Sequence, residues 1–387
     1  MLGWTLASLL IVAASAFAPT PSQYRGSYLT PIVAKDDDAP AQSAAVLMAL
    51  PPPAFLSTPL RMSAAAGGPA GKTRRAVAGD DNGGYFEDGT ILTLVEASAG
   101  ISEVTLIGTA HLSKRSIEQV TSTIESIRPG VVAVELDASR LHRIGLSESD
   151  LGSDFSTADD ISLPPLDDDV EEENSRPWWG PFRDVFLDSF TKLARGMLTG
   201  MYEDMSKSMG DEMIGGGEFL AAINAARRDD IKAKIVLADR DSMATIRRAS
   251  ELALRTGDPL GVMNKLSSTN AEEMGKLESQ VRKEMEGASE AEVMERLIET
   301  IKGDATFRDK LFARLEEEVP VFTRAFLTER DHIMAEAIRR ELEMDSGGGA
   351  TGGAPCVVVA VVGLAHLSGI ADNLRGGSGK LRFQDAP

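Results

Sequence analysis

Apolar residues follow two different periods along residues 90–375. Short apolar runs at 91–95, 104–107 and 131–136 predict β-strands, and the last run is apolar throughout, as expected for a strand buried on both faces. Between the second and third runs, residues 114–128 carry apolar side chains at helical spacing. This strand–helix–strand order predicts a right-handed crossover between two parallel strands.

The two periods continue toward the carboxyl end of the chain. They predict helices at 182–209, 218–228, from 241 onward, at 269–318 and at 321–343, and strands at 231–238 and 356–362. The fold class that follows is α/β, with a central, largely parallel β-sheet wrapped by helices in one domain at 90–375. The highly charged helices of 269–318 are expected to form a lid or an outer helical layer.

The chain ends and one internal segment do not fit this pattern. Residues 1–18 are apolar and include several small residues, which predicts a signal peptide, and 19–89 are interpreted as a transit peptide followed by a disordered linker. Residues 147–176 are acidic and predict a mobile insertion. The polar residues 376–387 predict a flexible tail.

Residues 14–19 (ASAFAP) resemble the plastid-entry motif of diatoms and related algae with complex plastids. The resemblance implies a plastid location reached through a bipartite targeting sequence. A simple secretory signal, and therefore a secreted or endomembrane-lumen protein, is the alternative. No later segment has 18 uninterrupted apolar residues, so we expect no transmembrane segment in the mature chain.

Composition narrows the classes of function. The formal net charge is −19 at pH 7, which argues against nucleic-acid binding because that requires a basic face. The single cysteine, Cys356, lies in an apolar run and excludes an internal disulfide. Apolar residues make up 43% of the chain, which is enough to build a sizeable folded core.

Two nearly identical segments, residues 108–113 (GTAHLS) and 363–368 (GLAHLS), carry the strongest chemical signal. Each follows a predicted strand, and five of the six positions match. We expect the glycine to let the backbone turn sharply out of the sheet, so that the histidine lies just beyond the carboxyl end of its strand. In open α/β sheets, ligands bind at that edge.

The crossover geometry brings further polar residues to the same edge. We expect four strands to deliver His111, Glu135, Asp239 and His366 toward one rim. Two imidazoles and a carboxylate suit zinc, manganese or cobalt, and water bound to such a metal can act as the nucleophile. The same groups can work without metal if a histidine acts as general base. A purely structural role, in which both histidines cap strands through backbone hydrogen bonds, is also open.

The predicted helix at 321–343 supplies a second group of charges. Counted from the apolar Phe326 and Ile333, Glu329 and Arg330 point toward the core side. Buried charges need partners, and Arg330 can pair with Glu135, with Asp239 or with a substrate carboxylate. A structural ion pair and a functional role are both open for Arg330.

Several motifs, taken in order, resemble the TraB/PrgY/GumN family, especially its eukaryotic TraB-domain-containing members. They are Gly-Thr-Ala-His at 108–111, Glu135 with Arg140, Gly-Gly-Glu-Phe at 216–219, Asp-Arg at 239–240, Thr-Glu-Arg-Asp at 328–331 and Gly-Leu-Ala-His at 363–366. The resemblance covers roughly residues 100–375. The family is related to the Tiki metalloproteases and, more remotely, to the erythromycin esterases, which implies paired Gly-x-x-His motifs at the site.

The resemblance also implies roles for individual residues. It implies His111, Glu135 and His366 as the core of the site. From the chemistry of these side chains we expect this core to hold the metal, and we expect Glu135, Glu329 and Arg330 to take part in catalysis. The supporting residues that it implies are Gly108, Arg140, Glu218, Asp239, Arg240, Asp331 and Gly363.

Three functional hypotheses follow. The first is a metal-dependent, peptidase-like hydrolase of peptide or peptide-like substrates, in which metal-bound water attacks, Glu135 or Glu329 takes the proton and Arg330 fixes a substrate carboxylate. The second is a non-catalytic regulatory module that binds a peptide or partner through the same cleft. The third is a metal-free, esterase-like hydrolase.

Overall fold

The computed structural model describes residues 90–96, 102–110, 114–163, 184–185, 187–192, 195–196, 216–346, 356–376 and 383–385. Within these residues the chain forms one seven-stranded sheet, in the order β4-β5-β3-β6-β2-β1-β7. The strands are β1 (Ile91–Glu96), β2 (Glu103–Thr109), β3 (Val131–Val134), β4 (Phe155–Thr157), β5 (Lys234–Leu237), β6 (Val357–Gly363) and β7 (Phe383–Asp385). The first five strands in that order are parallel, whereas β1 is antiparallel to both β2 and β7.

Helices account for most of the remaining described residues. The α-helices are α3 (Lys114–Ile127), α5 (Gly217–Ala226), α6 (Ser242–Arg255), α7 (Pro259–Ser268), α8 (Ala271–Glu284), α9 (Glu290–Gly303), α10 (Ala305–Glu318), α11 (Pro320–Thr323), α12 (Glu329–Ser346) and α13 (Leu367–Gly376). Shorter elements are the 3-10 helices η3 (Ala138–Ile144), η4 (Glu148–Leu151) and η7 (Leu364–His366), and the π-helical turn η6 (Arg324–Thr328). The predicted α/β class with a mostly parallel sheet is confirmed.

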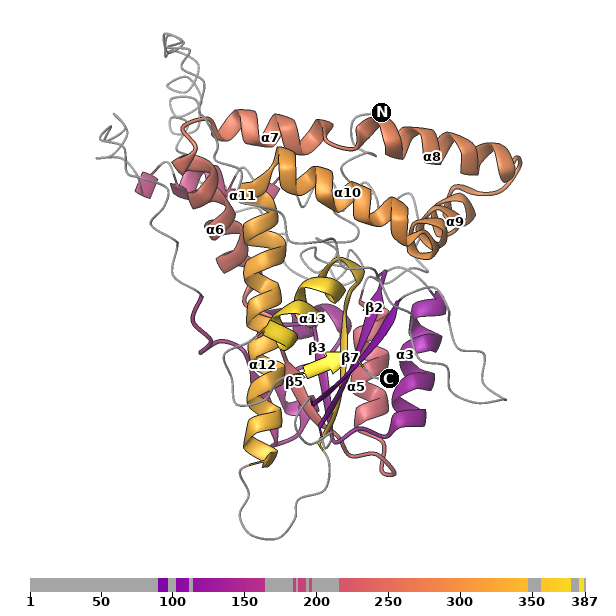
Figure 1. The fold of residues 1–387 in the computed structure, drawn as a ribbon, viewed down its shortest axis with the longest axis vertical. Coiled ribbons are helices and arrows are strands. Elements are labelled where there is room, and N and C mark those ends of the chain that lie inside the picture. The colour runs from indigo at the N-terminus through magenta and orange to yellow at the C-terminus, as the bar shows by residue number, and fades with distance from the viewer. Residues whose placement is uncertain are drawn as a thin grey trace, which may run out of the picture. The chain divides into compact units, whose positions relative to one another are not determined.

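Alternation along the central strands explains why helices cover both faces of the sheet. On β6, Val358 and Ala360 pack into the cluster formed with α12 and α13, whereas Val359 and Val361 pack into the cluster formed with α3 and α5. Successive side chains of a strand point to opposite faces, so an uninterrupted apolar strand needs cover on both. Figure 1 shows the two helix pairs separated by the sheet.

The charged segment 269–318 forms the three helices α8, α9 and α10, which share an apolar cluster of their own. Ala110, the residue directly after β2, belongs to the same cluster. Lys302 of α9 also donates to the Ser116 hydroxyl on α3, at 3.1 Å. This layer therefore packs at the carboxyl edge of the sheet, the edge at which the polar residues are expected (Figure 1).

Three segments differ from the sequence-based expectations. The helix predicted at 321–343 is interrupted by the π-helical turn η6, where the N–H of Glu329 donates to the carbonyl of Arg324, five residues back. The segment predicted as a mobile insertion begins with η4 and the edge strand β4. Residues 383–385 of the predicted tail pair with β1 as strand β7. The rest of the insertion, 164–176, and the targeting region 1–89 lie outside the described residues.

Among the residues that the structure describes, no helix combines the length and the apolar character needed to cross a membrane.

Helices α12 and α13 approach closely because Gly369 has no side chain. A Cβ atom at this position would lie 2.0 Å from Oδ2 of Asp331 and 2.6 Å from its Cγ. The Asp331 carboxyl group therefore occupies the space that a larger residue would fill, and the position of this carboxyl group depends on a glycine one helix away.

We predict that Gly369→Ala lowers the free energy of unfolding by about 1–3 kcal/mol, because the added methyl group overpacks a buried contact. Gly275 in α8 is the matched control, since a Cβ there meets nothing within 4 Å. Gly275→Ala should raise the free energy of unfolding by about 0.5–1 kcal/mol, because alanine is the better helix former. Urea unfolding of both variants checks this, and equal effects would contradict the steric explanation.

Candidate functional site

Glu135 joins the ends of two neighbouring strands at the carboxyl edge of the sheet. It follows β3 directly, and its backbone N–H donates to the carbonyl of Val361 on β6, at 3.1 Å. Its Oε2 accepts from the backbone N–H of Gly363, the last residue of β6, at 2.5 Å. The carboxylate is buried. Its remaining oxygen, Oε1, faces the guanidinium of Arg330.

Arg330 is the centre of the polar network. It lies in the first turn of α12 and is completely buried. Its Nε and Nη2 donate to the two carboxylate oxygens of Asp239, at 3.1 and 2.8 Å, and Nη2 also donates to Oε1 of Glu135. Nη1 donates to the carbonyl of Phe326 at 3.1 Å and lies 3.0 Å from Nε2 of His366. Arg330 thus links the edge of the sheet to α12 and α13.

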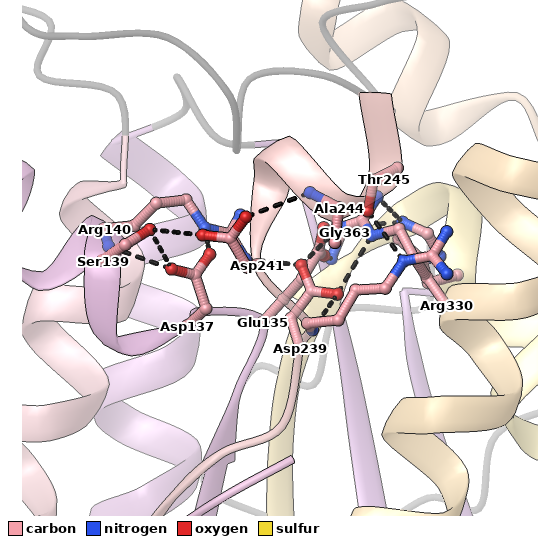
Figure 2. A network of polar contacts seen from close by, with 12 residues as sticks. Glu135, Asp137, Ser139, Arg140, Asp239, Asp241, Ala244, Thr245, Arg330 and Gly363 are labelled. Atoms are coloured by element: carbon pink, nitrogen blue, oxygen red, sulfur yellow. Dashed lines mark hydrogen bonds and ion pairs between the residues drawn. The ribbon is translucent and has the colours of Figure 1, made fainter. Parts of the chain in front are cut away.

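Asp239 lies between two arginines, as Figure 2 shows. It follows β5 and binds Arg330 on one side and Nη2 of Arg140 on the other, at 2.5 Å. Arg140 is also paired with Asp137. Burial alone raises the pKa of Asp239, but the guanidinium groups of Arg330 and Arg140 outweigh burial and hold that pKa below its usual range. Asp239 is therefore an ionised carboxylate that these arginines require as a counter-charge.

His366 is the only described histidine in this network. It ends η7 and is completely buried. Its Nδ1 lies 2.5 Å from Oδ1 of Asp331, and its Nε2 lies 3.4 Å from Oε1 of Glu135. Burial raises the pKa of Asp331, and His366 opposes this rise. Both His366 contacts are satisfied when Nδ1 carries the proton and donates to Asp331, which leaves the Nε2 lone pair to accept from Arg330.

Glu329 and Arg240 form a second group next to the first. Arg240 donates to Oε2 of Glu329 at 3.2 Å and to the carbonyl of Ala325 at 2.8 Å. Because Asp239 precedes Arg240 and Glu329 precedes Arg330, the ion pairs between the end of β5 and the start of α12 are crossed. Each element contributes one acid and one base, which fixes the position of α12 along the sheet edge.

The remaining predicted site residues are placed as follows. His111 lies outside the described residues, so its proposed meeting with His366 stays a prediction. Glu218 is buried in the first turn of α5. Gly108 lies within β2, where a Cβ would come within 2.7 Å of Leu364 Cδ1, and Gly363 has an ordinary extended backbone with φ −62°. We expected both glycines to allow a sharp backbone turn. Instead, Gly108 is required for close packing against Leu364, and the backbone of Gly363 is one that other residues also adopt.

The described residues do not by themselves fit a divalent metal. Nε2 of His366 and Oε1 of Glu135 are 3.4 Å apart, which matches the edge of about 3.4 Å of a tetrahedral site with bonds of about 2.1 Å. However, the Arg330 guanidinium bonds both of these atoms. A cation bound between them would face a fixed positive charge. The described part of the chain contains no group of three or more His, Cys, Asp or Glu arranged to hold a metal ion.

Sequence reasoning missed several residues that complete this arrangement. They are Asp137, Phe326 through its carbonyl, Gly369, Arg248 and Arg324. The sequence could have indicated Asp137 as a site residue, because it follows Glu135 by two residues at the same strand end. The contacts of Arg324 could not be predicted from the sequence, since they depend on a π-helical turn that the apolar pattern does not reveal.

Comparison with known proteins agrees with the motifs in this network. The sequence profile described as the TraB/PrgY/gumN family matches residues 182–375, half of the chain, which include Asp239, Arg330 and His366. The chain belongs to the TraB/PrgY/gumN family. The buried network of this TraB-family chain thus lies mostly within the matched region, and Glu135 and Arg140 are added from the residues that precede it.

Full-length relatives extend the similarity toward the amino end. The chain is 27% identical to the human TraB domain-containing protein over 289 residues, which cover 70% of this chain and 62% of the relative. It is 26% identical to the protein of that name from Bos taurus over 280 residues. It is also 27% identical to an uncharacterized protein of Methanocaldococcus jannaschii over 288 residues, which cover 74% of this chain and 57% of the relative. The TraB-family chain therefore spans less than two thirds of the length of these relatives.

We predict that Arg330→Met lowers the free energy of unfolding of this TraB-family protein by about 3–5 kcal/mol, because Asp239 and Glu135 lose their buried counter-charge. Arg282 is the matched control, since it also binds two carboxylates, Glu278 and Glu290, but at the surface. Arg282→Met should change the free energy by about 1 kcal/mol or less. Chemical denaturation measures both values, and similar losses for the two variants would refute a special role for Arg330.

Proposed function

We propose that this TraB-family protein is a hydrolase-type enzyme that acts on a peptide-like substrate, with His366 as the general base. The supporting observation is the placement of His366, whose Nδ1 lies 2.5 Å from the Asp331 carboxyl group and whose Nε2 faces Arg330 and Glu135. A carboxylate that accepts from Nδ1 orients the imidazole and keeps the lone pair on Nε2, as a histidine base requires.

The attacking water binds between Nη1 of Arg330 and Nε2 of His366 in this proposal. Nη1 keeps its bond to the Phe326 carbonyl, so opening the contact between Nη1 and Nε2 leaves the guanidinium paired. The water gives one proton to Nε2 while its oxygen attacks the substrate carbonyl carbon. The imidazolium then returns that proton to the leaving group. Asp331 and Glu135 stabilise the transient positive charge on His366.

A second candidate function is favoured by one specific observation. His366 and Arg330 are both 0% exposed, so neither the proposed base nor the central guanidinium offers an atom to a substrate in this conformation. A non-catalytic regulatory module, in which the network only holds the carboxyl edge rigid for a peptide or partner, needs no such access. This candidate predicts ligand binding without turnover.

The divalent metal expected from the sequence stays a prediction. His111, Glu135 and His366 would hold zinc, manganese or cobalt, and such an ion lowers the pKa of a bound water. Because Arg330 bonds two of these three residues, the proposed mechanism assigns the proton transfer to His366 and passes no step through a metal.

Hydrolysis of p-nitrophenyl acetate and of a fluorogenic peptide library tests the proposal. His366→Gln should lower kcat/KM by about 10²–10⁴-fold, as expected for loss of a general base. His142→Gln is the control, because His142 is exposed. Activity should survive a chelator.

Each other outcome selects one alternative. Loss of activity with a chelator, restored by zinc, manganese or cobalt, favours the metal-dependent hydrolase. Peptide binding with no turnover by the wild-type protein favours the regulatory module. Equal activity of His366→Gln and the wild type contradicts the proposed base.

We also propose a plastid location, supported by residues 14–19 and by the composition of 19–89. A fluorescent reporter fused to residues 1–89 should enter the plastid of an alga with a complex plastid. Replacing Phe17 by alanine should block entry, because Phe17 lies within the segment that resembles the plastid-entry motif. A reporter that is secreted instead would favour the alternative signal.

A further inference from the structure

Three arginines converge on the carboxylate of Glu329. Arg248 on α6 donates through Nε to both Glu329 oxygens, at 3.0 and 3.2 Å, and Arg240 donates to Oε2 at 3.2 Å. Nε of Arg324 lies 3.5 Å from Oε1. Glu251 is the only other carboxylate that pairs with these arginines among the described residues, at 3.7 Å from Arg248. Two carboxylates do not neutralise three guanidinium groups, so this arginine cluster (Arg240, Arg248 and Arg324) keeps an excess of positive charge in a chain whose net charge is −19.

The π-helical turn places Arg324 in the cluster. In an α-helix, side chains five residues apart point about 140° away from each other. In η6 the N–H of Glu329 bonds the carbonyl of Arg324, which widens the turn and brings Arg324 to the side of Glu329. Single π-turns inside helices occur frequently at functional sites.

Donor groups of the cluster remain available to a ligand. Among the described residues, the two Nη atoms of Arg324 and Nη2 of Arg248 make no hydrogen bond to protein, and Nη1 of Arg248 only approaches Glu251 at 3.7 Å. The Arg324 side chain is 33% exposed and that of Arg248 is 14% exposed. The buried Arg240 closes the inner side of the cluster. The side chains of Arg248 and Arg324 are therefore in part open to solvent.

We propose that Arg248 and Arg324 form a subsite for the terminal carboxylate of a peptide substrate. The planar Glu329 carboxylate already occupies the inner part of the cluster, where the guanidinium groups donate hydrogen bonds to it. The cluster therefore has the geometry to bind a carboxylate. A second carboxylate binds to the outward Nη atoms, where charge-assisted, forked hydrogen bonds are the preferred geometry.

The location of the cluster supports a subsite for the proposed hydrolase. Arg240 of the cluster directly follows Asp239 of the buried network, and Glu329, which the cluster binds, directly precedes Arg330 of the network. The two groups are therefore adjacent at two places along the chain. Arg330 itself is fully engaged by Asp239, Glu135 and the Phe326 carbonyl. In this proposal Arg248 and Arg324, and not Arg330, therefore bind the substrate carboxylate. Calling the ligand a substrate rests on the proposed function, whereas carboxylate binding does not.

Calorimetric titration with N-acetyl-trialanine and with its C-terminal amide tests the subsite directly. The wild-type protein should bind the free acid at least about ten-fold more tightly than the amide, as expected for the loss of charge-assisted hydrogen bonds. Arg324→Gln should remove this difference. Arg314→Gln should keep it, since Arg314 is also an exposed arginine between two carboxylates, those of Glu273 and Glu318, but lies on α10.

Two further arms keep the test decisive. Glu329→Gln should bind the free acid more tightly than the wild type, because the competing internal charge is gone. Inorganic phosphate at matched ionic strength should bind more weakly than the peptide acid. Equal binding of acid and amide by the wild type, an unchanged preference in Arg324→Gln, or phosphate binding as tight as the peptide would each overturn the assignment. All arms measure binding, so the subsite can stand even if hydrolysis is absent.

Discussion

The ion pairs of Arg330 with Glu135 and Asp239 join the sheet to helix α12, and the polar edge is built around them. Two carboxylates that end neighbouring strands would repel each other in a buried environment if no cation lay between them. The guanidinium removes that repulsion and gives all of its nitrogens a partner. The crossed pair of Arg240 and Glu329 then fixes α12 in one position along the edge, where Nη1 of Arg330 reaches Nε2 of His366.

The network of Arg330 contains more carboxyl groups than guanidinium groups. Its carboxyl groups outnumber its guanidinium groups by four to two; they belong to Glu135, Asp137, Asp239 and Asp331, facing Arg140 and Arg330. Burial raises the pKa of Asp331, and the contact with His366 opposes that rise. The network thus carries an excess of carboxylate charge, whereas the neighbouring arginine cluster has the opposite, anion-attracting charge.

Much of this arrangement could be predicted from the sequence, because it depends on simple periods. Apolar runs that end in Glu135, Asp239 and Gly363 had to place these residues at one edge of a parallel sheet, and helical spacing turned Arg330 inward. The contacts that depend on local departures from regular structure were not predictable. The π-turn before Glu329 spans only five residues, too few for its wider period to be recognised in the apolar pattern, and the pairing of 383–385 with β1 involves only three residues.

The contact between Gly369 and the Asp331 carboxyl group has a consequence for how related sequences are interpreted. The Gly-Leu-Ala-His string alone says nothing about whether its histidine has an acidic neighbour. The residue three positions after the histidine indicates whether such an acidic neighbour is present, because any side chain there competes for the volume that the carboxyl group fills. A chain with the same string but a bulky residue at that position must have moved its helix or lost the acid–imidazole pair. The absence of a side chain is therefore a diagnostic character of this site, as informative as the polar residues that surround it.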